Sequence, residues 1–329
     1  MKRNLIEEIT SIKERAEFNS RHNYGYHLDK IESTYKEIQK LNGDSNEEFL
    51  KYIPIATIAC FEAFFRSIVK ELIDFGKPYS ENTKLFNQSK NVKFDFDIVN
   101  AIQKKTVSIG EFISHILSFN NFDDINSNFS TLIGTDFVNT IKEFEGRIVI
   151  LENSKLFINN SNQIFSDVKK TYELRHIFCH EFATNFQSDK TEIFRCFNNS
   201  RIFLQQINDF IWDLLYPNAP TNQSELNEQS AENYEKIDLE FSILIEKIKE
   251  ISKEHSYLYL DENLFADAIK KWKAYRDAWA KSMSAGYEGG RMYHTIYPNS
   301  LTKVTKGKLE ELKSDFEMDL KKYINKLPE

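Results

Sequence analysis

The sequence predicts an all-α protein. Glycine and proline are scarce, with 10 Gly and 6 Pro among 329 residues, and no proline lies between Pro78 and Pro217. Turn-rich β folds need such residues far more often, so their scarcity favours long helices. Apolar residues also recur with helical spacing along most of the chain. With 27 Phe and 15 Tyr, the chain has enough apolar bulk to bury a substantial core.

The predicted helices fall into two groups on either side of a polar stretch. Residues 217–232, PNAPTNQSELNEQSAE, contain two prolines and almost no apolar side chains. Such a composition is typical of a linker between domains. We therefore predict a helical domain at residues 1–216, a linker at 217–232 and a second, smaller helical domain at 233–329.

In the first domain the most apolar helical pattern is EEFLKYIPIATIACFEAFFRSIVKELIDF at residues 47–75. It is followed by Gly76 and Pro78, which predict the end of the helix. The segment RIVIL at 147–151 fits either a strand or a helix. Helical spacing is also present at residues 2–41 with a break near Gly25, in shorter pieces within 80–164, at 165–183 and at 190–216.

The second domain contains three helical patterns and one long loop. Trp272, Tyr275 and Trp279 are expected to pack between helices, and Gly289 and Gly290 to permit a tight turn. The helices are predicted at residues 233–256, 263–285 and 304–326, with the loop GYEGGRMYHTIYPNS at 286–300.

The composition argues against several classes of function. The formal net charge is −7, and the residues from 217 onward carry 17 Lys and Arg against 20 Asp and Glu, so neither half is basic. A surface that coats nucleic acid is therefore not expected, although a local basic patch is compatible with these numbers. The start MKRNLIEEITSIKERAEF has no long apolar run, and we expect no window to reach the roughly eighteen apolar residues of a membrane span. The prediction is a soluble, cytoplasmic protein without membrane contact.

The three cysteines, Cys60, Cys179 and Cys196, lie within apolar helical patterns. An odd number of cysteines in such positions is not typical of a disulfide framework. We predict buried free thiols in a reducing compartment.

The stretch YELRHIFCHEF at 172–182 places Arg175, His176 and His180 in an apolar helix, in a chain with only seven histidines. At about 100° per residue, Arg175 and His180 point about 140° apart, so one helix does not easily aim both at one atom. Two copies packed across a twofold axis could place Arg175 of one chain beside His180 of the other. The spacing suggests a composite site in a dimer.

These residue types suit metal-independent cleavage of RNA. A histidine can take a proton from a ribose 2′-OH or give one to a leaving oxygen, and an arginine can hold the phosphate oxygens and stabilise the added charge. Two other interpretations stay open. Arg175 could pair with a local acid while the histidines are hydrogen-bonded helix residues. His176 and His180 also have the i, i+4 spacing of a zinc pair, although Ile177 stands where HExxH has glutamate and no third ligand is evident.

The stretch ELRHIFCHE resembles the signature of the HEPN superfamily, which is an arginine, a polar residue, three variable residues and a histidine. Arg175, His176 and His180 fill these places. The apolar helix IATIACFEAFFRSIVKELI at 55–73 is similar to the earlier core helix of HEPN proteins, so the resemblance covers most of residues 45–216. It implies a helical, usually dimeric endoribonuclease of toxin–antitoxin, abortive-infection or antiviral systems. Arg175 and His180 would be the catalytic pair and His176 the polar helper, with neither metal nor cofactor.

Glu62 and Arg66 are four residues apart within the apolar helix. The interpretation that we favour is an ordinary i, i+4 ion pair on the less buried edge of that helix. The alternative is that Glu62 supports the site by orienting Arg175 or one of the histidines.

Residues 268–313 resemble the LprI-like lysozyme-inhibitor family. Exported members carry a cysteine pair whose positions correspond here to Ala280 and Ser300, so that disulfide cannot form. With the preceding helix, the resemblance covers nearly all of 233–320, and it implies a small helical domain. We interpret it as an intracellular sensor or partner-binding module for a phage-derived trigger or a cognate inhibitor. The matching elements are Trp272, Tyr275-Arg276-Asp277, Glu288-Gly289-Gly290, Tyr297 and the stretch SLTKVT before the final helix.

Three hypotheses about function follow from these patterns. The first is a homodimeric defence or toxin endoribonuclease that cleaves RNA through Arg175, His176 and His180. The second is a non-enzymatic binding protein, either lysozyme-inhibitor-like or antitoxin-like. The third is a helical oligomerisation protein in which the polar motif only fixes the dimer register.

Overall fold

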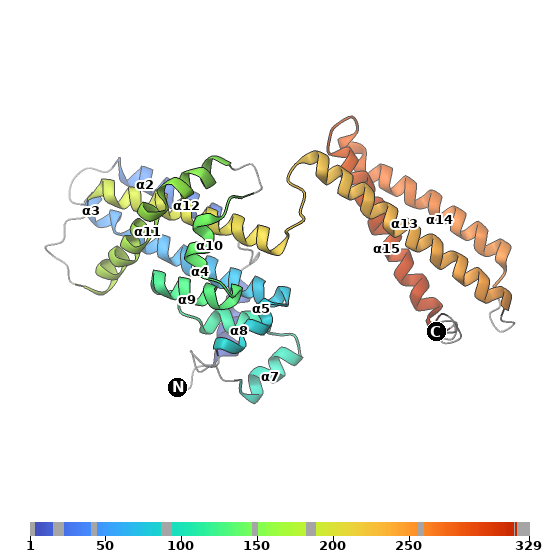
Figure 1. Ribbon diagram of the computed structural model, residues 1–329, viewed down its shortest axis with the longest axis horizontal. Coiled ribbons are helices and arrows are strands. Elements are labelled where there is room, and N and C mark those ends of the chain that lie inside the picture. The colour runs from blue at the N-terminus through green and yellow to red at the C-terminus, as the bar shows by residue number, and fades with distance from the viewer. Residues whose placement is uncertain are drawn as a thin grey trace. The chain divides into compact units, whose positions relative to one another are not determined.

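Every element that the computed structural model describes is a helix, which confirms the all-α prediction (Figure 1). The chain forms two compact units, Met1–Pro217 and Asn218–Glu329. The boundary therefore falls at the start of the predicted linker. The structure describes residues 4–15, 23–40, 45–86, 94–146, 151–181, 189–254, 260–318 and 320.

The N-terminal unit is built around one central helix, α4 (Tyr52–Phe75). The remaining helices are α1 (Leu5–Arg15), α2 (Tyr24–Ile38), α3 (Ser45–Leu50), α5 (Tyr79–Asn82), α7 (Phe96–Gln103), α8 (Ile109–Ile116), α9 (Phe122–Ile133), α10 (Phe137–Glu143), α11 (Leu151–His180) and α12 (Lys190–Leu215). Helices α2, α8, α11 and α12 all pack against α4, and α11 also packs along α12 (Figure 1). The helix that carries the arginine–histidine motif is thus supported by the central helix α4 and by α12.

Aromatic side chains fill the interior of this unit. Phe65 of α4 is fully buried, and its ring lies 5.8 Å from that of Phe119, 5.5 Å from that of Phe129 and 6.4 Å from that of Phe203. Aromatic rings at these distances attract one another beyond the gain from removing their surface from water. The high phenylalanine content of the sequence is therefore used in one continuous core.

One prediction about this core helix was wrong. By length and composition alone, Glu48–Phe75 could cross a membrane, although we expected no such window. In the folded protein 56% of its most apolar window is buried inside the structure. Ile58, Phe61 and Ile68 are almost fully buried against neighbouring helices. Burial in the protein core requires the same composition, so the fold accounts for the apolarity without a bilayer.

Helix boundaries in the N-terminal unit follow the predictions with local differences. Lys51 interrupts the predicted helix at 47–75, which is therefore α3 followed by α4. As predicted, helix α4 ends just before Gly76. The φ angle of Gly76 is +112°, a value that few residues other than glycine can adopt. Gly25 itself does not interrupt a helix, because it lies within α2, which begins at Tyr24. Of the ambiguous segment 147–151, only Leu151 is described, and it begins α11.

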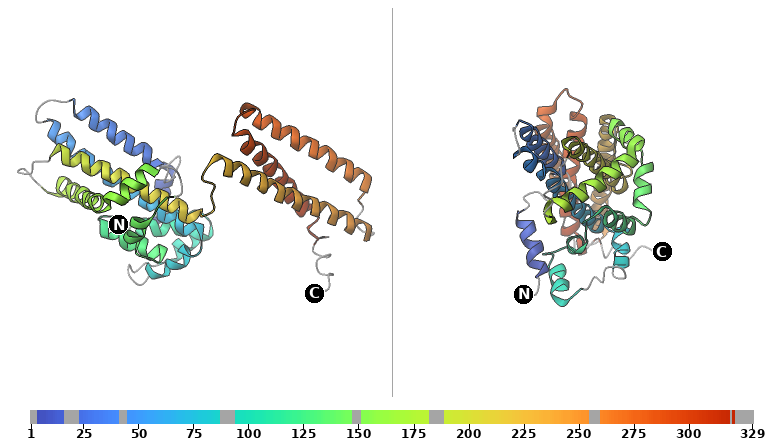
Figure 2. Two further views of the ribbon diagram at one scale, coloured as in Figure 1. Left: turned by 45° about the horizontal axis from the view of Figure 1, so that its top comes forward. Right: turned by 90° about the vertical axis from the view of Figure 1, so that its left-hand side faces the viewer.

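The C-terminal unit is a bundle of three long helices, α13 (Gln223–Glu254), α14 (Glu262–Ser284) and α15 (Tyr293–Asp315) (Figure 2). A short turn of 3-10 helix, η2 (Ala285–Tyr287), follows α14, and the next turn contains Gly289 at a φ of +78°. Helix α15 packs against both α13 and α14. The core of this unit is small and consists of Phe241, Leu244, Ile245, Ile248, Leu309 and Leu312.

Two helices of this bundle begin earlier than predicted. Helix α13 starts at Gln223, so the second half of the predicted linker is helical. The Asn222 side chain accepts a hydrogen bond from the Glu225 backbone amide at 3.0 Å and thereby caps the start of α13. Helix α15 starts at Tyr293, within the predicted loop. Near that start, Thr295 is buried and accepts a 2.7 Å hydrogen bond from the Gln223 side chain. This tertiary contact stabilises a first turn that the local sequence does not predict.

Arg276 connects α14 to α13. Its guanidinium group is buried, with Nη1 donating to Asp238 Oδ1 at 2.6 Å and Nε donating to Asp277 Oδ1 at 2.9 Å. The rings of Tyr234 and Trp272 each lie 5.5 Å from it. A buried charge is tolerated only when it is paired in this way.

The aromatic residues of α14 are divided between two faces. Trp272 packs between helices as predicted, with its ring 4.7 Å from that of Phe241. Tyr275 and Trp279 do not, because they are 55% and 46% exposed. The face of α14 that carries Arg276 is the one turned inward, and it leaves these two rings outside.

Candidate active site at the end of α11

The position of α11 is fixed by a buried carboxylate. Asp167 is 2% exposed and accepts hydrogen bonds from Arg195 Nε at 3.1 Å, Asn199 Nδ2 at 2.6 Å and Gln163 Nε2 at 3.1 Å. Burial alone raises the pKa of Asp167, but these hydrogen bonds outweigh it and lower the pKa below its ordinary value. We did not single out Asp167 from the sequence. The available signal was an acid in the apolar helix, two turns before Arg175.

The arginine and the second histidine of the motif touch each other. Arg175 Nη1 lies 3.3 Å from His180 Nε2. Because a guanidinium group only donates, Nε2 is the acceptor in this hydrogen bond. Arg175 is half-buried and His180 is exposed, so the pair lies at the protein surface. An incoming phosphate could reach both side chains.

The expectation that one helix does not easily bring these two groups together was wrong. Both belong to the same α11 of one chain. Two features of helix geometry explain the contact. His180 is the last residue of the helix, and helical side chains lean back toward the N-terminus, where the long Arg175 side chain can curve around to meet it. A second subunit is therefore not needed to assemble the pair.

His176 lies beside this pair on the exposed surface. Its ring centroid is 5.3 Å from that of His180, and its Nε2 is 3.9 Å from Glu181 Oε1. Both of these ion-pair partners are more than half exposed, so their interaction is weak. Arg175, His176 and His180 thus gather at the C-terminal end of α11, where positive side chains also interact favourably with the helix dipole.

Tyr172 is the buried neighbour of this surface group. It lies one turn before Arg175, and its hydroxyl group has no hydrogen-bond partner among the described residues. Burial strongly raises the pKa of Tyr172, the negative charge of Glu62 raises it further, and the positive charge of Arg175 lowers it. The charges of Glu62 on α4 and Arg175 on α11 therefore shift the pKa of the same hydroxyl group in opposite directions.

Glu62 does not form the ion pair that we favoured. Among the described residues its carboxylate has no hydrogen bond or salt bridge, whereas Arg66 Nη1 donates to the backbone oxygens of Ser114 at 3.4 Å and His115 at 3.0 Å. Arg66 thereby satisfies carbonyls at the end of α8. Glu62 instead lines a hollow of about 340 Å³ between α1, α4 and α8. That Glu62 orients Arg175 or one of the histidines stays a prediction.

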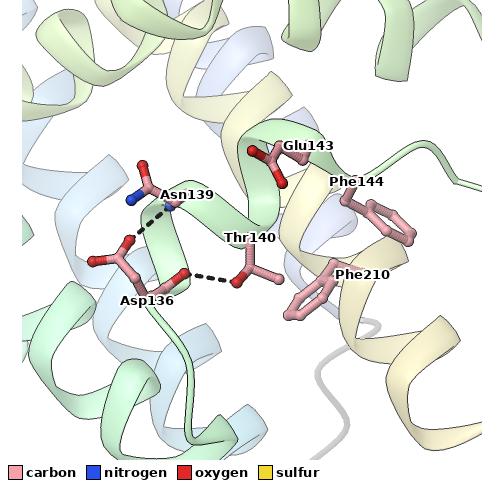
Figure 3. A pocket seen from close by; sticks show the side chains of 6 residues that line it. All are labelled: Asp136, Asn139, Thr140, Glu143, Phe144 and Phe210. Atoms are coloured by element: carbon pink, nitrogen blue, oxygen red, sulfur yellow. Dashed lines mark hydrogen bonds between the residues drawn. The ribbon is translucent and has the colours of Figure 1, made fainter.

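A second hollow, of about 430 Å³, lies between α10 and α12 (Figure 3). The polar groups drawn there make local bonds: Asp136 accepts from the Asn139 amide at 2.8 Å and from Thr140 Oγ1 at 2.7 Å. These bonds cap and stabilise the first turn of α10. No residue of the arginine–histidine motif lines either hollow, so the motif forms a surface site.

The cysteines are only partly as predicted. Cys60 and Cys196 are buried free thiols, and burial raises the pKa of Cys60 to about 11 and that of Cys196 to about 12. Cys179 is also free but exposed, because it shares the outward surface of α11 with His176 and His180.

Within the described part of the chain, no three His, Cys, Asp or Glu side chains converge on a possible metal position.

Comparison with known proteins bears on the second unit. Residues 217–312 match the family described as lysozyme inhibitor LprI. The match begins at the boundary between the two units and ends at Leu312 within α15, and it agrees with the resemblance found in the sequence. No curated protein and no solved structure matches the chain. The HEPN resemblance of the N-terminal unit therefore stays a prediction.

Proposed function

We propose that the N-terminal unit is a metal-independent endoribonuclease and that the C-terminal unit is a binding module that regulates it. The observation that carries the first part is the 3.3 Å contact between Arg175 Nη1 and His180 Nε2 at an exposed helix end. The LprI match supports the second part. RNA is the substrate, the cytoplasm is the site of action, and the HEPN resemblance implies a homodimeric effector of antiviral or toxin systems.

In the proposed mechanism the bound RNA lies between Arg175 and His180, so that each side chain contacts the RNA and no longer the other side chain. His180 Nε2, which already acts as an acceptor, takes the proton from a ribose 2′-OH. The 2′-oxygen bonds to phosphorus, the bond to the 5′-oxygen breaks, and a protonated imidazole returns a proton to that oxygen. Arg175 holds the non-bridging oxygens and stabilises their added charge. His176 is the nearby second imidazole that can donate this proton.

RNA cleavage in the presence of EDTA tests this mechanism. The purified full chain should leave 2′,3′-cyclic phosphate ends, and His180→Ala or Arg175→Ala should reduce the rate by roughly 10²- to 10⁴-fold. Cys179→Ser is the matched control, since Cys179 is exposed on the same turn and has no role in the mechanism. Cleavage that needs a divalent metal ion, or that survives both active-site substitutions, would contradict the proposal.

The LprI match favours a second candidate, a non-enzymatic inhibitor-like binding protein. This candidate predicts that the full chain lowers the activity of a lysozyme and that Arg175→Ala and His180→Ala leave this inhibition unchanged. A titration of lysozyme activity against the wild type and these two variants separates the candidates. Inhibition without RNA cleavage would support the second one, and the absence of inhibition at a large excess of the chain would contradict it.

A further inference from the structure

The exposed end of α11 presents two imidazole rings on adjacent helical turns. His176 and His180 are four residues apart, so they lie on one face of the helix, and both are exposed. Their ring centroids are 5.3 Å apart. The proposed mechanism uses the rings for proton transfer, and none of its steps requires both rings to act on one atom. Their closeness therefore allows a second kind of chemistry at the same place.

The separation of the two rings fits a shared metal ion. An imidazole nitrogen binds Zn²⁺ at about 2.0–2.1 Å, and the preferred geometry of the ion is tetrahedral. Two imidazoles on one tetrahedral zinc ion therefore have ring centroids about 5 Å apart. The 5.3 Å between His176 and His180 agrees with this value. The helix thus already holds the two rings at the separation that a shared zinc ion needs.

The site would have two protein ligands only. Among the described residues, no third His, Cys, Asp or Glu side chain converges with the two histidines. Water therefore completes the coordination, and exposed Cys179 is not a ligand although it lies in the same turn. Structural zinc sites have four protein ligands and bind far more tightly. We expect a dissociation constant on the order of ten micromolar and ready release of the ion.

We propose that His176 and His180 form a binding site for Zn²⁺ and that the bound ion inhibits RNA cleavage. The inhibition rests on the proposed function, whereas the metal site does not. Zinc takes the Nε2 lone pair of His180, which accepts the hydrogen bond from Arg175 and is the proposed acceptor of the 2′-OH proton. A histidine bound to zinc through this nitrogen cannot act as the base. Mg²⁺ prefers oxygen ligands and should not bind here.

Two neighbouring charges act on this site in opposite directions. Arg175 Nη1 lies 3.3 Å from His180 Nε2, so it competes with zinc for the lone pair, and its positive charge repels the ion. Glu181 Oε1 lies 3.9 Å from His176 Nε2, and its negative charge attracts the ion. Arg175→Ala should therefore tighten zinc binding at least about threefold, although the same substitution should abolish RNA cleavage.

Isothermal titration calorimetry of the untagged full chain with zinc chloride tests the site. His176→Ala should weaken zinc binding at least about tenfold, because a single imidazole cannot chelate the ion. His294→Ala is the matched control, since it removes an exposed histidine of α15 by the same substitution and should leave binding unchanged. Cys179→Ser should also leave binding unchanged. Circular dichroism of each variant checks that it is folded.

The titration has outcomes that would overturn the metal site. A wild type that binds zinc no more tightly than His176→Ala would do so. Loss of binding in Cys179→Ser would show that the thiol holds the ion, and weaker binding in Arg175→Ala would show that the ion does not compete with the arginine.

RNA cleavage measured with zinc and with EDTA tests the inhibition. Zinc at ten times its dissociation constant should lower the rate about tenfold, because only about a tenth of the chains stay free of the ion. Excess EDTA should restore the rate, and the same concentration of Mg²⁺ should have no effect. A chain that binds zinc through His176 and cleaves RNA at an unchanged rate would overturn the inhibition. A chain that cleaves no RNA in EDTA would refute the proposed function and the inhibition with it, whereas the zinc titration still decides the metal site.

Discussion

The two units bury charge in very different surroundings. In the N-terminal unit, Asp167 lies beside a large aromatic core and is held by Arg195, Asn199 and Gln163. In the C-terminal unit, Arg276 lies beside a core of six buried apolar side chains and is held by two carboxylates. A small core contributes less hydrophobic stabilisation, so each polar contact accounts for a larger share of the total. The difference predicts that the two units depend on different interactions.

The surfaces of the two units also differ. The N-terminal unit exposes its reactive groups, Arg175 and His180, at the end of a well-supported helix. Large apolar side chains are exposed on both units, for example Phe96 on α7 and Leu264 on α14. The contrast between the two surfaces therefore rests on the contact between Arg175 and His180, not on exposed apolar side chains.

The largest expected effect comes from the aromatic core. Phe65→Ala should destabilise the N-terminal unit by roughly 3–5 kcal/mol, because it removes buried contacts with five other rings and leaves a cavity. The C-terminal unit should keep its transition, since it has a core of its own. Scanning calorimetry of the full chain should show one shifted and one unshifted transition. If both transitions shift together, the units are not independent and the comparison fails.

A smaller effect is expected from the buried arginine. Arg276→Met keeps the side-chain volume similar but leaves Asp238 and Asp277 without their partner. These carboxylates are 32% and 48% exposed, so water can partly solvate them, and the expected loss is about 1–3 kcal/mol rather than the larger cost of a fully buried pair.

Chemical denaturation followed by tryptophan fluorescence should show this loss in the C-terminal transition. Asp277→Asn is the control, because it removes only one of the two carboxylate partners and should cost less. An Arg276→Met protein as stable as the wild type would show that this unit does not depend on the buried charge.

Much of the fold follows from local sequence, and the failures have a common physical cause. The helices around α4 and α12 were predicted because their apolar spacing and the residues that end them are local features. Periodicity identifies the apolar face of a helix, but not whether another element covers it. That is why Tyr275, Trp279 and Cys179 were expected inside and lie outside. Only the three-dimensional arrangement decides which apolar face is left without a partner.

The candidate site shows the same limit at the level of side chains. Arg175, His176 and His180 were identified from their order along the chain, and the structure brings them together. Their contact within one helix was not predicted, because angles around a helix axis ignore the reach of a long side chain at a helix end. Asp167 was missed because its role depends on partners about thirty residues later in the chain, which are neighbours only after α11 and α12 pack.

The smallest expected effect concerns the pH dependence of the N-terminal unit. The pKa of Asp167 is lower in the folded protein than its ordinary value, because hydrogen bonds from Arg195, Asn199 and Gln163 outweigh burial. A lowered pKa contributes stability that is complete above the unfolded-state value of about 3.9 and is lost as pH falls through the folded-state value. Asp167→Asn should therefore cost about 1 kcal/mol at pH 7 and progressively less as the pH falls below 4. Urea unfolding at pH 7, 4 and 3 measures this convergence in the transition of the N-terminal unit. If the difference between Asp167→Asn and the wild type stays constant over this range, the buried carboxylate does not stabilise the N-terminal unit through its charge, and the contrast with Arg276 has to rest on packing alone.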